Sequence, residues 1–144
     1  MKITPAWKDA EGKGLKDIGW ALEYDGSISF DEAIKIEIGS KCLKVSGSLT
    51  SKLHINASGS IKAGEWIMAG EWIEAGFQIR CRKTLAFRFN LFAGTAVWKK
   101  TTEDDQLVEC AELKGGEIKH GILRIISPEG KTEHPGRNSK EDGI

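Results

Sequence analysis

Residues 61–76 read IKAGEWIMAGEWIEAG, in which isoleucine, a variable residue, alanine and glycine return every six positions. Followed in both directions, the period gives ten consecutive aliphatic residues: Leu43, Leu49, Ile55, Ile61, Ile67, Ile73, Ile79, Leu85, Leu91 and Val97. Two positions after most of them stands a small residue, as in Ala63, Ala69 and Ala75. A run of this length identifies a structural repeat, which decides the fold before any other feature does.

A six-residue period fits a three-residue strand followed by a three-residue corner. Residues i and i+2 of a strand share a face, so the aliphatic and the small residue point inward together. The residue between them, such as Lys62 or Glu74, points to solvent, and glycines such as Gly70 relieve the backbone at the corners. Three such repeat units close one triangular coil. The predicted class is therefore all-β, a single-stranded parallel β-helix or solenoid.

The flanks of the repeat look like imperfect coils. Leu22, Ile28 and Ile34 keep the period in another phase, which predicts an insertion of about three residues within residues 37–42. Residues 101–106 form a charged loop, after which looser strands begin at Leu107 and Leu113, and about six coils fit before residue 126. We predict an N-terminal cap over residues 1–17, a β-helix domain over 18–126 and a disordered charged tail over 127–144.

The hand of the coil follows from the order of residues within the repeat. Left-handed hexapeptide transferases place their small residue two positions before the aliphatic one, whereas here it lies two positions after. Parallel crossovers are also generally right-handed. We therefore expect a right-handed coil.

Composition narrows the class of protein. The 144 residues make one domain, and 21 Lys and Arg against 21 Asp and Glu exclude bulk positive or negative charge as the basis of binding. No stretch resembles a signal peptide or a membrane span, so we expect a cytoplasmic protein without membrane contact. Cys42, Cys81 and Cys110 are odd in number and lack metal-like spacing, which favours reduced thiols.

Residues 59–64 (GSIKAG) and 70–76 (GEWIEAG) resemble the Gly-x-Ile-x-Ala-Gly repeats of small β-helix proteins from phages and mobile elements. Residues 91–100 are similar to the segment that closes those arrays, and bactofilins, which polymerise end to end, resemble the repeat more distantly. The likeness covers roughly residues 43–100. It implies a β-helix that binds other macromolecules, with a phage or mobile-element origin in a bacterial host.

Catalytic chemistry is hard to find in the chain. Hexapeptide acyltransferases as a family use a histidine at an intersubunit cleft, and this chain offers His54, His120 and His134. His134 falls in the predicted tail and His120 is expected to face inward, which leaves His54, more simply read as a surface corner residue. No nucleophile and base are paired by spacing, and the glycines match no phosphate-binding loop. We expect no enzyme, no cofactor and no metal.

Two outward groups are candidate binding residues. Lys44, Lys62 and Arg80 are separated by three repeat units each and should stack as a cationic ladder, with Arg82 and Lys83 beside the top rung. Stacked like charges repel, and an acidic protein or a phosphate backbone would relieve them. Alternatively, Glu65 and Glu74 neutralise the ladder.

Aromatic corners form the second group. Trp66 and Trp72 should point out of the coil, Trp72 in a column with His54 and Asn90 and beside Phe89. Exposed tryptophan is unusual and frequent at interface hot spots. Alternatively, the cap or the tail covers these rings, and base stacking on them is a further option that leaves direct nucleic-acid binding open.

Together these features favour a non-enzymatic macromolecule-binding β-helix protein. The finer hypothesis is a phage or mobile-element inhibitor of a bacterial defence complex, anti-CRISPR-like, acting by protein-protein contact. The alternative is a bactofilin-like scaffold that assembles as a homo-oligomer through its coil ends, and a third hypothesis is a hexapeptide-type acyltransferase using His54. The predicted partner-binding residues are Trp66, Trp72, Lys44, Lys62, Arg80, Arg82, Lys83 and Phe89.

Overall fold

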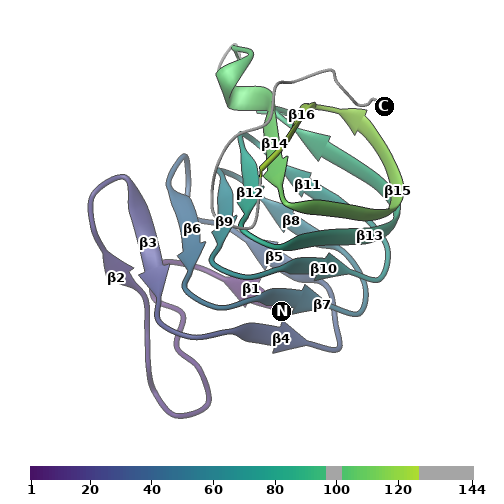
Figure 1. Cartoon of the computed structure of the whole chain (residues 1–144). Helices are drawn as coiled ribbons and strands as arrows, with labels where there is room; N and C mark the ends of the chain where they lie inside the picture. Colours follow the sequence, from purple (N-terminus) through teal and green to yellow (C-terminus); the bar gives the residue numbers. More distant parts are fainter. Residues whose placement is uncertain (97–101, 127–144) are drawn as a thin grey trace.

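The computed structural model describes residues 1–96 and 102–126 and shows an all-β parallel solenoid of about six turns. In each turn the chain passes through three faces, and successive turns stack into a coil (Figure 1). The first face holds β3 (Ala21–Tyr24), β6 (Cys42–Val45), β9 (Ile61–Ala63), β12 (Ile79–Cys81), β14 (Leu107–Cys110) and β16 (Ile122–Ile125). The second face holds β4 (Ile28–Phe30), β7 (Leu49–Ser51), β10 (Ile67–Ala69) and the first parts of β13 (Thr84–Ala93) and β15 (Glu112–His120). The third face holds β5 (Ile34–Ile36), β8 (Ile55–Ala57), β11 (Ile73–Ala75) and the second parts of β13 and β15.

The register of the strands confirms the repeat. Leu43 pairs with Ile61 and Ile61 with Ile79, so one turn takes three repeat units in the middle of the coil. Leu22, however, pairs with Leu43, so the turn between them is longer by three positions. These extra positions lie between β5 and β6, where the phase change predicted them.

The core is a column of aliphatic side chains along the axis. The repeat isoleucines and leucines of β6 to β13 are fully buried, and the alanines beside them are buried too. The residue between each pair is partly or fully exposed. Each buried isoleucine contributes about 1.5–3 kcal/mol through the hydrophobic effect, so the stack is stabilised at every strand.

At the corners, glycine can be required either because two stacked turns approach closely or because the backbone adopts a positive φ. A Cβ at Gly70 would lie 1.9 Å from the carbonyl oxygen of Lys52, one turn below, and Gly70 has no positive φ. Gly94, by contrast, adopts φ +76°, in the left-handed region. The expected relief of the backbone at the corners is thus, at Gly70, a matter of space between stacked turns.

Residues 1–17 lie against the first turn. β1 (Lys2–Ile3) pairs in parallel with β5, and β2 (Lys16–Asp17) pairs antiparallel with β3. Trp7 packs against the core, with its ring 5.4 Å from that of Tyr24. The expected tail, with His134, lies outside the described residues, as do Val97 and Thr101. The right-handed sense of the coil stays a prediction.

The last turns are looser, as predicted. Ile79 pairs with Val108, well beyond the regular spacing, because the connection after β13 contains a longer loop. The described part of this loop ends in a short 3-10 helix, η1 (Asp104–Gln106). The prediction for His120 was wrong, because this side chain is exposed and one ring nitrogen contacts the carbonyl oxygen of Ala93. Ile118 pairs with Leu91 but His120 pairs with Phe92, so an extra residue in β15 moves His120 to an outward position.

Candidate functional site

The structure places Lys44, Lys62 and Arg80 opposite one another on β6, β9 and β12, as the spacing of the repeat predicts. The same outward column continues beyond them. Glu23 stands opposite Lys44, and Glu109 stands opposite Arg80. The cationic ladder is therefore three rungs long, and a carboxylate closes it at each end.

These two carboxylates pair with the outer rungs. Lys44 Nζ lies 3.3 Å from Glu23 Oε2, and Arg80 Nε lies 3.1 Å from Glu109 Oε1. Glu109 is buried and is also bound by Arg124, whose Nε donates to Glu109 Oε2 at 2.8 Å. Neutralisation of the ladder is therefore partial.

The carboxylates expected to neutralise the ladder, Glu65 and Glu74, do not pair with any of its three rungs. Glu65 Oε2 lies 3.9 Å from Lys83 Nζ at the corner after β12. Glu74 lies on the third face, opposite Asn56 and Phe92. Lys83 is thus a paired corner cation, whereas Arg82 beside it is exposed and has no ion pair among the described residues.

Lys62 is the exception in the ladder. Its ammonium forms no ion pair with a carboxylate in the part of the chain that the structure describes, although both cations next to it do. Partial burial, together with the charges of Arg80 and Lys44, holds the pKa of Lys62 below its usual value. Among the described residues, the ammonium of the middle rung therefore has no carboxylate paired with it.

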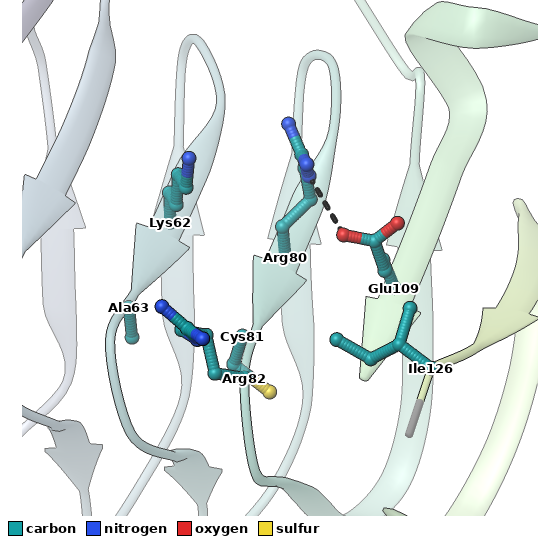
Figure 2. A pocket seen from close by; sticks show the side chains of 7 residues that line it. All are labelled: Lys62, Ala63, Arg80, Cys81, Arg82, Glu109 and Ile126. Atoms are coloured by element: carbon teal, nitrogen blue, oxygen red, sulfur yellow. Dashed lines mark hydrogen bonds and ion pairs between the residues drawn. The ribbon is translucent and has the colours of Figure 1, made fainter. Parts of the chain in front are cut away.

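A hollow opens on each side of this rung. One, of about 240 Å³, is seen in Figure 2, where Lys62 and Arg80 extend side by side and Arg82 lies below them. Its lining consists of Lys62, Ala63, Arg80, Cys81, Arg82, Glu109 and Ile126. The other, of about 150 Å³, is lined by Trp20, Ser40, Cys42, Ser60, Ile61, Lys62, Gln78 and Arg80.

Trp20 was missed by sequence reasoning. It is the most exposed of the large apolar residues that the structure describes, at 57%, and Lys44 Nζ lies 5.8 Å from its ring centre. A signal was available, because the shifted phase of Leu22 and Ile28 already placed Trp20 at a corner. The first face thus combines an aromatic side chain with the cations.

The second face has a different character. Its outward residues on three successive rungs are Thr50, Met68 and Ala86, none of which is charged. Large apolar side chains stand around them, at the strand and at its two corners. We call these the apolar surface, and its members are Leu53, Trp66, Met68 and Phe89, which are 38–51% exposed.

Trp72 is less available than expected. Its ring stacks on that of His54, with centroids 4.2 Å apart and planes 3° from parallel, so the predicted column exists but one ring face is covered. His54 Nδ1 also lies 3.6 Å from Glu71 Oε1. These contacts are those of a surface corner residue, and the acyltransferase hypothesis built on His54 gains no support from them.

The thiols are core residues. Cys42, Cys81 and Cys110 are free and buried, and burial raises the pKa of Cys42 to about 11, that of Cys81 to about 12 and that of Cys110 further. They are protonated at neutral pH and so are poor nucleophiles. Within residues 1–96 and 102–126, no cluster of three His, Cys, Asp or Glu could hold a metal ion, and no helix is long and apolar enough to cross a membrane.

Replacing Lys62 by glutamine should stabilise the fold. Removal of the repulsion from Lys44 and Arg80 is expected to raise the free energy of unfolding by about 0.5 kcal/mol at pH 7, a small effect because the site is partly solvated. The lowered pKa of Lys62 means that the folded state disfavours its charged form. The penalty is thus complete at neutral pH and disappears as the pH rises through the folded and then the unfolded pKa.

Urea denaturation at low salt measures this effect. Lys44→Gln is the matched control, because it also relieves the repulsion on Lys62 but breaks the pair with Glu23, so the two effects should largely cancel. The advantage of Lys62→Gln should shrink in high salt, which screens the repulsion. A loss of stability in Lys62→Gln would show that its ammonium is compensated in the fold.

The chain was compared with family models, curated proteins and solved structures. No family model, no curated protein and no solved structure matches the chain. What is established is the architecture, a parallel β-solenoid of about six turns.

Proposed function

We propose that this protein is a non-enzymatic binding protein that docks the apolar surface of its second face against a protein partner. The observation that carries the proposal is the exposure of Trp66, Met68, Leu53 and Phe89 around three uncharged rungs. Large exposed apolar groups gathered on one side of a soluble protein are typical of interaction sites. Aromatic residues are also enriched at the centres of interfaces.

The contrast between the faces supports this choice. The outward column of the first face is charged on every rung from Glu23 to Arg124. The third face carries Lys35 and Glu74 in its column, with Asn56 between them. The second face alone has three successive neutral rungs among the turns from β7 to β13, so burying this column removes no charge from water.

The stacked strands also hold this surface rigid. Met68 lies on β10, which is paired with β7 on one side and β13 on the other. The backbone beneath the apolar surface therefore does not need to be ordered when a partner binds. A preformed surface loses less conformational entropy on association.

The resemblance of the repeats to phage and mobile-element proteins supports the finer form of the proposal. In that form the partner is a bacterial defence complex, and the protein inhibits it by contact. The outward apolar surface suits such a role because it needs neither a cofactor nor a catalytic group. Capture from bacterial lysate identifies the partner.

One observation favours the alternative of a self-assembling scaffold. Among the described residues, no strand pairs with the outer edges of β15 and β16, and open edges invite further strands. However, ion pairs between Lys114 and Glu112 and between Lys119 and Glu117 line β15, and charged side chains oppose edge pairing. Filaments in negative-stain microscopy would favour the scaffold over a docking protein that elutes as a monomer or dimer.

The double variant Trp66→Ala with Phe89→Ala tests the proposal. We expect it to weaken partner binding by about a hundredfold or more, because two exposed anchors are lost. The free energy of unfolding should change by less than about 1 kcal/mol, as for most surface substitutions. The measurement is capture from bacterial lysate with mass spectrometry, followed by calorimetric titration of the purified partner.

The control is Asn56→Ala with Glu74→Ala, two neighbouring outward residues on the third face. This variant should retain the same partner with wild-type affinity. If every specifically captured protein were kept by the Trp66 and Phe89 variant, the second face would not be the docking side. A large loss of stability in that variant would show instead that these rings support the fold.

A further inference from the structure

The hollow beside Lys62 has the features of an anion site. Lys62 has no carboxylate partner among the described residues, and Arg80 and Arg82 line the same hollow. In Figure 2 Lys62 and Arg80 extend side by side, and Arg82 lies below them. A half-buried cation between two other cations is unfavourable for the fold. A bound anion in the hollow would compensate the charge of Lys62.

The local charge is strongly unbalanced. Among the described residues, Glu109 is the one carboxylate that lines the hollow, and it is already bound by both Arg80 and Arg124. Three cations, Lys62, Arg80 and Arg82, line the hollow with this single carboxylate, in a chain of zero net charge. Among the described residues the lining therefore carries two positive charges in excess, around a hollow of about 240 Å³.

The length of the ladder limits the kind of anion. Between Glu23 and Glu109 the column has only three successive cationic rungs, about 4.8 Å apart, and the next cation, Arg124, lies beyond Glu109 and is paired with it. Binding of a nucleic-acid backbone needs cations along several phosphates. The geometry suits a single oxyanion group instead.

We propose that the hollow over Lys62 binds one phosphomonoester group, held by the Lys62 ammonium and the Arg80 and Arg82 guanidinium groups. A phosphomonoester carries about −1.5 to −2 charges at pH 7 and three acceptor oxygens, so it matches the local excess better than a carboxylate does. Arginine forks favour phosphate oxygens because they donate two parallel hydrogen bonds. Lys62 and Arg80 lie on the first face and Arg82 at the corner that leads to the second, and none of the three belongs to the apolar surface.

The second hollow gives room for an organic group on the phosphate. It shares Lys62 and Arg80 with the first hollow and adds the exposed Trp20. Ser40, Ser60 and Gln78 add polar groups to its lining. An aromatic ring attached to the phosphate would reach a surface on which it can stack.

Amide chemical shifts in NMR titrations of the full chain test this proposal. The probes are inorganic phosphate and phenyl phosphate, with acetate at equal ionic strength, at about pH 7.5 where phosphates are mostly dianionic. We expect saturable shifts at Ala63 and Arg82 with both phosphates. Acetate should bind at least about tenfold more weakly than phosphate. Tighter binding of phenyl phosphate, lost in Trp20→Ala, identifies an aromatic phosphomonoester as the ligand class, and equal affinities identify free phosphate.

Two variants decide the role of Lys62. Lys62→Gln should weaken phosphate binding about tenfold, while Lys44→Gln, whose cation is paired and lies outside the hollow, should stay within about threefold of wild type. The proposal is overturned if neither phosphate saturates the shifts by roughly 50 mM, or if Lys62→Gln binds as the wild type does. The Trp66 and Phe89 double variant should bind phosphate normally, so this test and that of the docking surface fail separately.

Discussion

Replacing Ile67 by aspartate is expected to abolish the folded coil. Ile67 is fully buried and pairs with Leu49 below and Leu85 above, both also fully buried. A carboxylate there would have neither a cation nor water within the core. The expected loss is about 4 kcal/mol or more, a large part of the roughly 5–15 kcal/mol that usually holds a domain folded.

The neighbouring residue gives a matched control. Met68→Asp places the same carboxylate one position further along β10, where the side chain is 41% exposed. Its stability should stay within about 1 kcal/mol of wild type. Circular dichroism with urea denaturation measures both variants, and a cooperative, wild-type-like transition for Ile67→Asp would mean that Ile67 does not face the axis.

Gly70→Ala should be the next most damaging change. The added Cβ would lie 1.9 Å from the carbonyl oxygen of Lys52 and 2.8 Å from its carbonyl carbon, and both are backbone atoms. The backbone of the two turns would have to separate at this corner, which strains the hydrogen bond from Gly70 N to Ser51 O, now 3.0 Å long. We expect a loss of about 3 kcal/mol.

Gly14→Ala serves as its control. A Cβ there would find its nearest heavy atoms at 3.4 Å, close to an ordinary contact, and Gly14 has no positive φ. Its effect should be near zero or slightly stabilising, since alanine lowers the entropy of the unfolded chain. Thermal unfolding compares the two, and equal effects would mean that the corners are not tightly stacked at Gly70.

Most of the fold could be predicted because its signal is local. An aliphatic and a small residue two positions apart define one strand, and the glycine that follows defines one corner. The three-residue insertion before β6 was predictable for the same reason, as a change of phase between Ile34 and Leu43. The prediction for His120 was wrong because β15 contains an extra residue between Ile118 and His120, which shifts the register. No residue type in the sequence marks that extra position.

The candidate site was predictable only in part. Lys44, Lys62 and Arg80 follow the regular spacing of the repeat, so their stacking could be derived. The position of Glu23 opposite Lys44 follows from the predicted three-residue insertion before β6, whereas Glu109 could not be placed, because it is reached across the long loop after β13. The length of that loop changes the register by an amount that the sequence pattern does not reveal.

The spacing of residues alone thus predicts the coil. Each short strand buries an aliphatic residue and a small residue two positions later, and the next strand repeats this pattern six positions along the chain. Which charges are paired, and which cation is left over, depends on contacts between residues that lie more than one regular turn apart in the sequence. Such contacts exist only once the turns are stacked in register. For that reason Lys62 looks like one of three equivalent cations in the chain and becomes the uncompensated one in the fold.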